Sequence, residues 1–431
     1  MVPGFELLAR LLDAAESAAP VDAVTAVTRE VGKRLSATAV SFLIVDTSGR
    51  CLVRMAHDPL TSPQAAGSTS TASAGQRTVG EEHARTVPLE GGPIERVLRG
   101  QRPEIQPPAH HADPWTVLAP VTERGEVLGV LELLLPEEPS KEDVDEIASL
   151  AHLLAFVVIA NRRHTDLFEW GQRSRPLSLS AEIQQRLLPG PHTCEGGAFT
   201  LSGWLEPAAD IAGDTFDYSL QRNVLYLSMT DAMGHGVGAA LTATLCVGAL
   251  RGSRRAGAPV TEQVANANAA VAEHGAAHGL DDFVTGLVGR LDLRTGVLTL
   301  VNAGHVAPYL LRGTDVGTVD LPVNLPFGLF PDAAYEAATV TLDPGDRIVL
   351  VTDGMLERNA SSSDLPAAIR ESAHLHPREA AMALADSVLA ATGHALSDDA
   401  TILCLDWYGG HGDSRTTHGG AEVLRASRST G

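Results

Sequence analysis

Cysteine is scarce in this chain. There are four cysteines among 431 residues, Cys51, Cys194, Cys246 and Cys404, and none forms a Cys-x-x-Cys pair. Scattered thiols of this kind are typical of a reducing compartment, where structural disulfides are rare. The sequence therefore predicts no disulfide framework and no zinc site, and it favours a cytoplasmic location.

Basic residues are also in short supply. The chain has 32 Lys and Arg against 53 Asp and Glu, which gives a formal net charge of −21. Nucleic acids and anionic membrane surfaces attract basic proteins, because both carry dense negative charge. We therefore expect neither a nucleic acid nor a membrane among the partners.

Long hydrophobic runs are missing as well. The longest, LAHLLAFVVIA at 150–160, is shorter than the ~20 residues that a transmembrane helix requires. The first residues, MVPGFELLARLLDAAESA, include acids but no basic segment, so no signal peptide is expected. Aromatic residues make up only 4% of the chain, and no cluster of them with His or Cys indicates a haem or a chromophore. Apolar residues still reach 44%, enough for cores, and ~150 residues per domain predicts two or three domains.

Residues 1–163 are predicted to form a first domain of helices and paired strands. Apolar residues at helical spacing predict two helices within 5–35, and AVSFLIVD and CLVRMAHD, joined by TSGR, predict a β-hairpin. Residues 60–85 are rich in Ser, Thr, Gly and Ala, which predicts a mobile loop. A short helix in GGPIERVLRG and a strand pair in WTVLAPVTERGEVLGVLELLLP follow. A long helix then begins at Ser140, with its capping partner expected near Glu142.

This order of elements resembles a GAF domain. The motifs that carry the resemblance are GGPIERVLRG, VLAPV, EVLGVLELL and the long closing helix. Over about residues 5–163 the resemblance implies an α+β fold with an antiparallel sheet, in a sensor for a small-molecule or protein signal. The fold alone does not name the ligand. His110 and His111 lie in PPAHHADP, which we interpret as a solvated loop rather than as a ligand site.

Residues 164–190 connect this domain to a second one that spans 191–408. Apolar residues at helical spacing in the connection are interrupted near Pro176, which predicts a broken helix. It is either a plain connector or a helix that transmits a signal or forms a homodimer contact. The tail at 409–431, GGHGDSRTTHGGAEVLRASRSTG, has too few apolar residues to fold alone and is predicted to be disordered.

Acidic residues recur beside strands and glycine turns in the second domain. They are Asp214, Asp217, Asp231, Asp353, Asp398 and Asp399. One Asp-Gly after a strand is usually a hairpin turn, but repeated placements of this kind are harder to explain as turns. Clustered carboxylates repel one another unless a cation lies among them, and oxygen ligands select hard cations such as Mg²⁺ or Mn²⁺. Two such ions ~3.5–4 Å apart activate a water and hold a phosphoryl group, so the pattern predicts hydrolysis of a phosphate ester.

The glycines after Asp231 allow a different interpretation. GHGVGA at 234–239 matches the Gly-x-Gly-x-x-Ala pattern of a dinucleotide-binding loop, and it lies between a predicted strand and a predicted helix. That fold needs a second parallel strand ending in an acid ~20 residues further on. Here the helix leads instead into LRGSRRAGAPVTEQVANANAAVAEH, a second helical stretch. We therefore disfavour a dinucleotide site, and the absence of a Gly-x-x-x-x-Gly-Lys-Ser/Thr motif excludes a P-loop.

Several motifs of the second domain occur in a family order. They are IQQRLLP, DIAGDTFDY, MTDAMGHGVGAALTATL, DFVTGLVGRLDLRTGVLTLVNAGHVAPYLL, LPFGLF, LDPGDRIVLVTDGMLE and SDDATILCL. Over about 180–408 this order resembles the bacterial metal-dependent PP2C-type phosphatases of the RsbU and SpoIIE group. The resemblance implies an α/β/β/α sandwich, two Mn²⁺ or Mg²⁺ ions, and serine/threonine phosphatase activity. It also implies a phosphorylated STAS-domain anti-sigma factor antagonist as the substrate in a partner-switching pathway.

The same resemblance implies a set of metal ligands. They are Asp214, Asp231, the carbonyl of Ala232, Asp353, Asp398 and Asp399. Asp231 is expected to bridge both ions, Asp214 to bind directly or through water, and Asp399 to lie behind the ligands. Ala212-Gly213-Asp214 replaces the family's Gly-Gly-Asp, and Thr215 replaces an aromatic residue. These departures remove no ligand, although they affect the side of the site that receives the substrate.

Two histidines lie in the same motifs. His235 in MGHG is a candidate general acid for the leaving serine oxygen, and Asp231, Asp214 and His235 form the expected catalytic set. A loop hydrogen bond is the alternative for His235, and it is favoured for His305. Asn302 and Gly304 are expected to shape the loop around His305. A domain that is catalytically inactive and only docks a STAS or anti-sigma partner is the alternative function.

Overall fold

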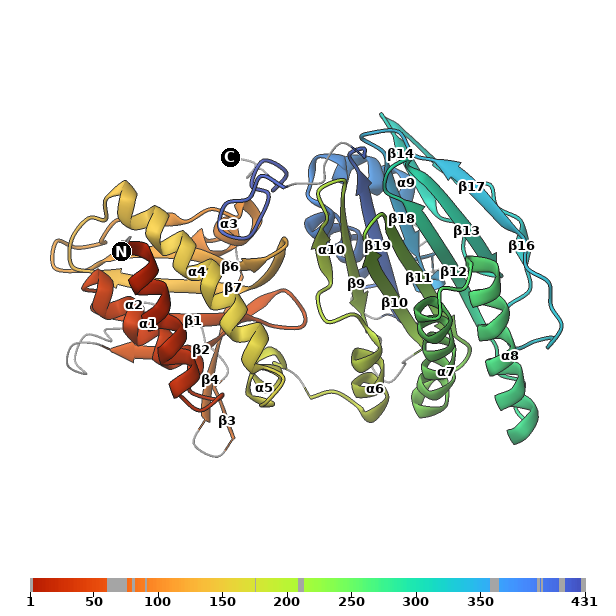
Figure 1. Ribbon diagram of the computed structural model, residues 1–431, viewed down its shortest axis with the longest axis horizontal. Coiled ribbons are helices and arrows are strands. Elements are labelled where there is room, and N and C mark those ends of the chain that lie inside the picture. Colours follow the sequence, from red (N-terminus) through yellow and green to blue (C-terminus); the bar gives the residue numbers. More distant parts are fainter. Residues whose placement is uncertain are drawn as a thin grey trace. The chain divides into compact units, whose positions relative to one another are not determined.

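The computed structural model describes residues 3–59, 76–79, 82–89, 91–174, 176–207, 213–356, 364–393, 396, 398–410 and 415–427. The chain forms two compact units (Figure 1). The first contains Met1–Pro176 together with Thr416–Gly431, and the second contains Leu177–Arg415. No helix among the described residues has the length and apolar character needed to cross a bilayer.

The first unit is built on one antiparallel sheet. Its strands are β1 (Ala39–Val45), β2 (Cys51–Pro59), β3 (Gln76–Val79), β4 (Glu82–Pro88), β5 (Glu104–Gln106), β6 (Trp115–Glu123) and β7 (Glu126–Leu135). Within the described residues the sheet has seven strands in the order β3-β4-β2-β1-β7-β6-β5. β1 is apolar on both faces because both faces of the sheet are covered.

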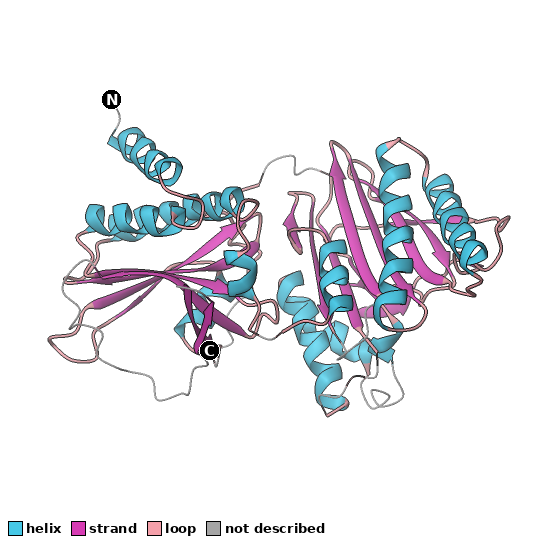
Figure 2. Ribbon diagram, turned by 90° about the horizontal axis from the view of Figure 1, so that it is seen from below, coloured by secondary structure: helices cyan, strands magenta, loops and turns pink. Residues whose placement is uncertain are grey.

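Five helices belong to the described part of the first unit; four contact the sheet, and the first packs on the second. They are α1 (Pro3–Ser17), α2 (Ala23–Leu35), α3 (Pro93–Gly100), α4 (Lys141–Asn161) and α5 (Leu167–Gln172). Residues of α2 and α4 share a core with one face, and Val97 and Leu98 of α3 pack on the other. Figure 2 shows α4 lying along its face of the sheet. The Ser140 cap is confirmed, but its partner is Asp143 instead of Glu142, because only the third helical position reaches back to the cap.

The prediction of a loop over 60–85 is wrong in part. Residues 60–75 lie outside the described residues, but the end of the segment forms β3 and β4. These strands consist of QRTV and EHARTVP, in which charged residues hide the apolar alternation that normally marks a strand. Pairing of β4 with β2 supplies the context that the local sequence does not show.

Two further sheets form the second unit. Their strands are β8 (Thr193–Glu195), β9 (Phe199–Glu206), β10 (Asp214–Gln221), β11 (Val224–Ala232), β12 (Val284–Asp292), β13 (Val297–Ala303), β14 (Tyr309–Arg312), β15 (Asp315–Thr318), β16 (Val323–Asn324), β17 (Ala337–Thr341), β18 (Arg347–Val351) and β19 (Ala400–Trp407). Among the described residues each sheet has six strands, in the orders β10-β11-β12-β13-β16, with β17 beside β13, and β15-β14-β18-β19-β9-β8. Phe199, Phe216, Leu287, Leu350 and Trp407 belong to the core between the sheets.

Helices pack on the outer faces of these two sheets. They are α6 (Leu179–Leu187), α7 (Gly236–Arg255), α8 (Val260–His278), α9 (Leu365–Glu371) and α10 (Pro377–Ala391). α7 and α8 lie side by side on the β11–β13 sheet, and α10 covers β9 and β19 (Figure 1). The α/β/β/α sandwich that the family resemblance implies is therefore confirmed.

Two domain boundaries differ from the sequence prediction. The break near Pro176 is confirmed, but α6 belongs to the second unit and not to a separate connection, because it packs against α7. The guanidinium of Arg251 on α7 donates to the carbonyl of Leu187 at the end of α6, at 2.5 Å. The described part of the tail is also structured, and 416–427 belongs to the first unit. Composition did not predict this structure, because the segment packs on another part of the chain and needs no core of its own.

Candidate functional site

Strands β10 and β11, at one edge of a sheet in the second unit, bring Asp214 and Asp231 together. Asp214 begins β10 and Asp231 lies near the end of β11, and the two residues are direct partners in the antiparallel register. Side chains at directly opposite positions project from the same face of a sheet. Asp214 is 2% exposed, whereas Asp231 is partly exposed. One carboxylate of the pair is therefore buried, and the other lies nearer to solvent.

Two threonine hydroxyls from the second sheet hold the Asp214 carboxylate. Thr352 Oγ1 donates to Asp214 Oδ2 at 2.7 Å, and Thr401 Oγ1 donates to the same oxygen at 2.6 Å. The backbone N–H of Thr401 donates to Thr352 Oγ1 at 3.0 Å. Asp214 therefore joins the two sheets at this edge and has a fixed orientation.

A buried glutamine of α6 reaches the same edge. Gln184 Nε2 donates to the backbone carbonyl of Asp214 at 2.9 Å and to Asp399 Oδ2 at 2.6 Å. Gln184 and Asp399 are each 1% exposed. Asp399 is therefore more deeply buried than Asp353 and Asp398, and α6 is part of the structure that supports the site.

Asp353 and Asp398 lie on the more open side of the site. Asp353 opens the 3-10 turn η1 (Asp353–Leu356) and is exposed, and Asp398 is half-buried just before β19. Between them, Gly354 lies so close to the loop before β19 that a Cβ there would overlap the carbonyl oxygen of Asp399. A glycine at this position therefore allows the turn that carries Asp353 to approach the Asp398–Asp399 loop.

Ala232 follows Asp231 at the end of β11. Its N–H donates to the carbonyl of Gly213 at 3.2 Å. A Cβ at Gly213 would stand 2.5 Å from the carbonyl oxygen of Ala232. The glycine therefore leaves space beside this carbonyl, which is the backbone oxygen that the family resemblance implies as a metal ligand.

The carboxylates repel one another strongly. Burial, with the charges of Asp231 and Asp399, raises the pKa of Asp214 well above its usual value. Burial, with the charges of Asp353, Asp398 and Asp399, raises the pKa of Asp231 to about 7. Within the described residues, however, no three His, Cys, Asp or Glu side chains converge as ligands of one ion. The acids therefore share one electrostatic environment without forming a closed cage, and their oxygens suit a hard divalent cation.

The two histidines have different environments. His235 is the N-cap residue of α7, its side chain makes no capping hydrogen bond, and it is exposed beside the Asp231 turn. His305 is buried, and its Nδ1 lies 2.8 Å from Thr285 Oγ1. Burial lowers the pKa of His305 to about 4, so the ring is neutral near pH 7. Asn302 bonds the backbone N–H and carbonyl of His305, which supports the prediction that Asn302 shapes this loop.

The comparison with protein families decides the class of this site. The family described as Stage II sporulation protein E (SpoIIE) matches residues 221–408. This part of the chain is a SpoIIE-type phosphatase domain. Asp231, His235, Asp353, Asp398 and Asp399 all fall within the matched residues.

Two curated relatives of this chain are named phosphoserine phosphatases. The phosphoserine phosphatase RsbU of Bacillus subtilis is 26% identical over 286 residues, which cover 64% of this chain and 83% of RsbU. The phosphoserine phosphatase RsbP of the same organism is 24% identical over 197 residues, 43% of this chain and 46% of RsbP. These sequence comparisons identify the SpoIIE-type domain as that of a protein serine/threonine phosphatase.

Solved structures resemble the chain more distantly. The RsbU and RsbW domains of a Mycobacterium tuberculosis protein match with 24% identity and a TM-score of 0.43, over 52% of this chain and 62% of that one. The SiaA PP2C domain of Pseudomonas aeruginosa matches with 21% identity and a TM-score of 0.44, over 53% of this chain and 94% of that one. Because both scores are below 0.5, the assignment of the SpoIIE-type domain rests on the sequence comparisons.

The strand directions exclude the dinucleotide interpretation of the glycine loop. β11 delivers Asp231 between β10 and β12, and it is antiparallel to both. A dinucleotide fold needs parallel strands at this point. The turn after Asp231 is therefore a strand-to-helix connection of the SpoIIE-type domain.

The sequence analysis grouped Asp217 with the acids of the site, but Asp217 lies elsewhere. It also missed several residues that support the site. Asp217 forms ion pairs with Arg251 at 2.8 Å and Arg254 at 2.9 Å. The missed residues are Gln184, Thr352 and Thr401. For these three residues the only signal in the sequence was that Gln184 lies within the IQQRLLP motif. The hydrogen-bond partners of all three are set by packing between distant segments of the chain.

Proposed function

We propose that this chain uses two divalent ions, Mn²⁺ or Mg²⁺, to hydrolyse phosphoserine or phosphothreonine in a partner protein. The observation that carries the proposal is the group of mutually repelling aspartates around Asp231 in a SpoIIE-type domain. Carboxylates clustered in this way are stabilised by cations. Bound ions would polarise the phosphoryl group and lower the pKa of an attacking water.

The more exposed acids are the best candidates to hold the ions. Asp231 would bridge them, with the Ala232 carbonyl on one ion and with Asp353 and Asp398 on the other. Asp214 and Asp399 are more deeply buried and hydrogen-bonded to other side chains, so we assign them to positioning. For Asp214 this favours contact with the ions through water, one of the two modes of binding that the family resemblance implies.

His235 is the candidate general acid. Its exposed ring stands at the start of α7, beside the turn that follows Asp231. An imidazolium there would donate a proton to the serine oxygen as the phosphate ester breaks. Asp231 completes the proposed catalytic set at the reacting phosphate, and Asp214 is a positioning residue that orients the strand pair.

The proposed substrate is a phosphorylated STAS-domain anti-sigma factor antagonist. The curated relatives RsbU and RsbP are named phosphoserine phosphatases, which supports the chemistry of this substrate. We further propose that the first unit is a GAF domain that receives a small-molecule or protein signal. The signal would pass through the 164–190 segment, which would also form a homodimer contact.

Hydrolysis of p-nitrophenyl phosphate and of a phosphoserine STAS protein tests this function. We expect purified full-length protein with Mn²⁺ to hydrolyse both, and EDTA to stop both reactions. A folded, metal-loaded protein that binds the STAS protein but hydrolyses neither compound would establish the alternative, an inactive docking module.

A further inference from the structure

The chain leaves the second unit and returns to the first at its C-terminal end. The second unit ends at Arg415, and residues 416–427, the C-terminal segment, belong to the first unit. The two units are therefore joined by two stretches of chain, one at Pro176–Leu177 and one at Arg415–Thr416. If the C-terminal tail were disordered, only the connection at Pro176–Leu177 would join the two units.

The C-terminal segment is seated on the turn between β6 and β7 and on α4. The N–H of Gly125 in this turn donates to the carbonyl of Gly420 at 3.4 Å. Gly420 has a φ of +93°, and a Cβ there would overlap both the carbonyl oxygen of Thr122 and the ring of His152. His152 Nδ1 in turn lies 2.8 Å from the Thr122 carbonyl. The fit thus requires glycine for its backbone conformation and for its close approach.

The segment is also folded within itself. His418 and Ala421 form an isolated antiparallel bridge around Gly419 and Gly420, and Ala421 is 1% exposed. By contrast, Leu424 is 79% exposed. The segment therefore presents a tight glycine turn to the rest of the first unit. Leu424 is a position in the same segment at which a substitution should leave the docking unchanged.

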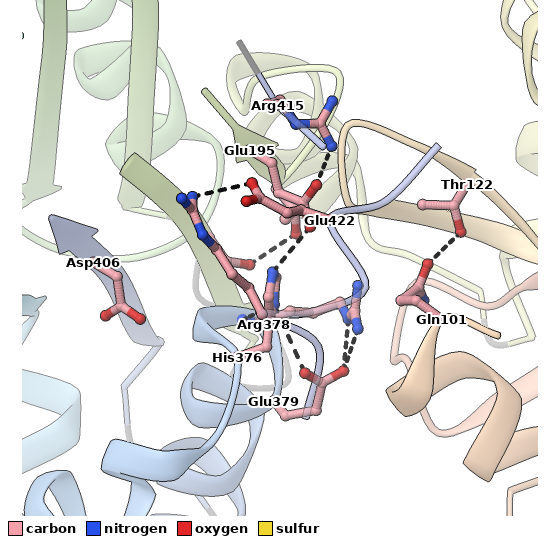
Figure 3. Close-up of polar contacts among 12 residues, drawn as sticks. Gln101, Thr122, Glu195, His376, Arg378, Glu379, Asp406, Arg415 and Glu422 are labelled. Carbon is pink, nitrogen blue, oxygen red and sulfur yellow. Dashed lines mark hydrogen bonds and ion pairs between the residues drawn. The ribbon is translucent and has the colours of Figure 1, made fainter. Parts of the chain in front are cut away.

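A buried ion pair fixes the other end, where the chain leaves the second unit. Arg415 is paired with Glu195 of β8, and Figure 3 shows the guanidinium directed at this carboxylate. Glu195 is 1% exposed, and its other oxygen lies 3.5 Å from Nε2 of His376, the residue before α10. Removing one member of a buried pair leaves an uncompensated charge, so the pair holds Arg415 in place.

Helix α4 is linked to both connections between the units. Toward the second unit, α4 leads through α5 to α6, where Gln184 contacts Asp214 and Asp399. His152, in the middle of α4, is the residue against which Gly420 packs. We propose that Arg415 and the C-terminal segment together form a docked tether through which α4 controls the phosphatase unit. Gly420 holds the tether on the first unit, and Arg415 holds it on the second.

The test uses the full-length chain and three variants. Gly420→Val disrupts the end on the first unit, Arg415→Gln disrupts the end on the second, and Leu424→Ala is the matched control. Circular dichroism establishes folding. Hydrogen exchange followed by mass spectrometry then reports on peptides covering 119–128 and 416–427. Hydrolysis of p-nitrophenyl phosphate with Mn²⁺ reports on control of the phosphatase, and only this second readout rests on the proposed function.

We expect Gly420→Val to accelerate exchange in both peptides by about tenfold or more, because local opening replaces docking. We expect Gly420→Val and Arg415→Gln to change turnover in the same direction by about fivefold, the lower end of typical coupling between sites. Leu424→Ala should match wild type in both readouts. Unchanged exchange in a folded Gly420→Val protein would overturn the docking, and faster exchange with unchanged turnover would overturn the control. If wild type hydrolyses nothing, the proposed function fails, while the exchange data still decide the docking.

Discussion

Gln184 and Asp399 are 215 positions apart in the sequence, and a hydrogen bond of 2.6 Å joins them. The same amide of Gln184 donates to the backbone of Asp214. A helix at the start of the second unit is therefore bonded directly to the loop that carries the last acids of the site. Movement of α6 would alter the environment of both aspartates.

Replacing Gln184 should weaken the site more than it weakens the fold. Gln184→Ala leaves the buried Asp399 carboxylate without this donor, at a cost of about 1–3 kcal/mol. We expect lower turnover and a higher Mn²⁺ concentration for half-maximal activity. Gln185→Ala is the matched control, because no hydrogen bond joins Gln185 to the site among the described residues. Equal Mn²⁺ requirements for the two variants would show that Gln184 supports only the fold.

The metal-free protein should lose stability as the pH rises from about 4 to about 7. The pKa of Asp231 is raised to about 7, so the folded state retains a proton that the unfolded state releases near its ordinary value of 3.8. Protonation therefore favours the folded state at low pH, and this contribution is lost as the pH passes through 7. It is on the order of 4 kcal/mol at most. Urea unfolding at pH 5 and pH 8 in EDTA measures the part lost above pH 5, which is about 2.7 kcal/mol.

Asp231→Asn provides the control for this pH dependence. The amide does not titrate, so the fall in stability between pH 5 and pH 8 should be smaller than in wild type. An identical pH profile for the two metal-free proteins would show that the repulsion does not centre on Asp231.

Mn²⁺ or Mg²⁺ should raise the melting temperature of the metal-free protein. An ion that binds only the folded state adds about 2.7 kcal/mol of stability at a concentration of 100 times its Kd. The candidate ligands are all oxygen atoms, so activity after EDTA should return with Mn²⁺ and should not require Zn²⁺. Tight stoichiometric zinc in the purified protein, or a melting temperature indifferent to millimolar Mn²⁺, would contradict the proposed ligand set.

The second unit should hydrolyse a small phosphate ester without the first. A fragment of residues 177–415 contains α6, both sheets and every proposed ligand. A fragment that starts at residue 189 lacks α6, and with it Gln184 and the buried Leu187 and Leu188, so we expect it to lose folding or activity. A folded, metal-loaded but inert 177–415 fragment beside an active full-length protein would show that the first unit contributes directly to the site.

Much of the site was predictable because its acids stand beside strands and glycine turns. Asp231 and Asp353 follow apolar strands, and Asp398 and Asp399 precede one, so local sequence was enough to find them. The buried bonds of Asp214 to two threonines were not predictable, since they depend on how two sheets pack. Composition likewise gave no sign that Gly420 docks against His152, because that contact joins segments far apart in the chain.

Turnover by Asp231→Asn is the most direct test of the proposed site. The variant and wild type are compared in hydrolysis of p-nitrophenyl phosphate over a range of Mn²⁺ concentrations, with melting curves to establish that both are folded. We expect the folded variant to lose at least ~100-fold in turnover at all Mn²⁺ concentrations, because Asp231 would hold both ions. Wild-type turnover by a folded Asp231→Asn protein would contradict the two-metal site.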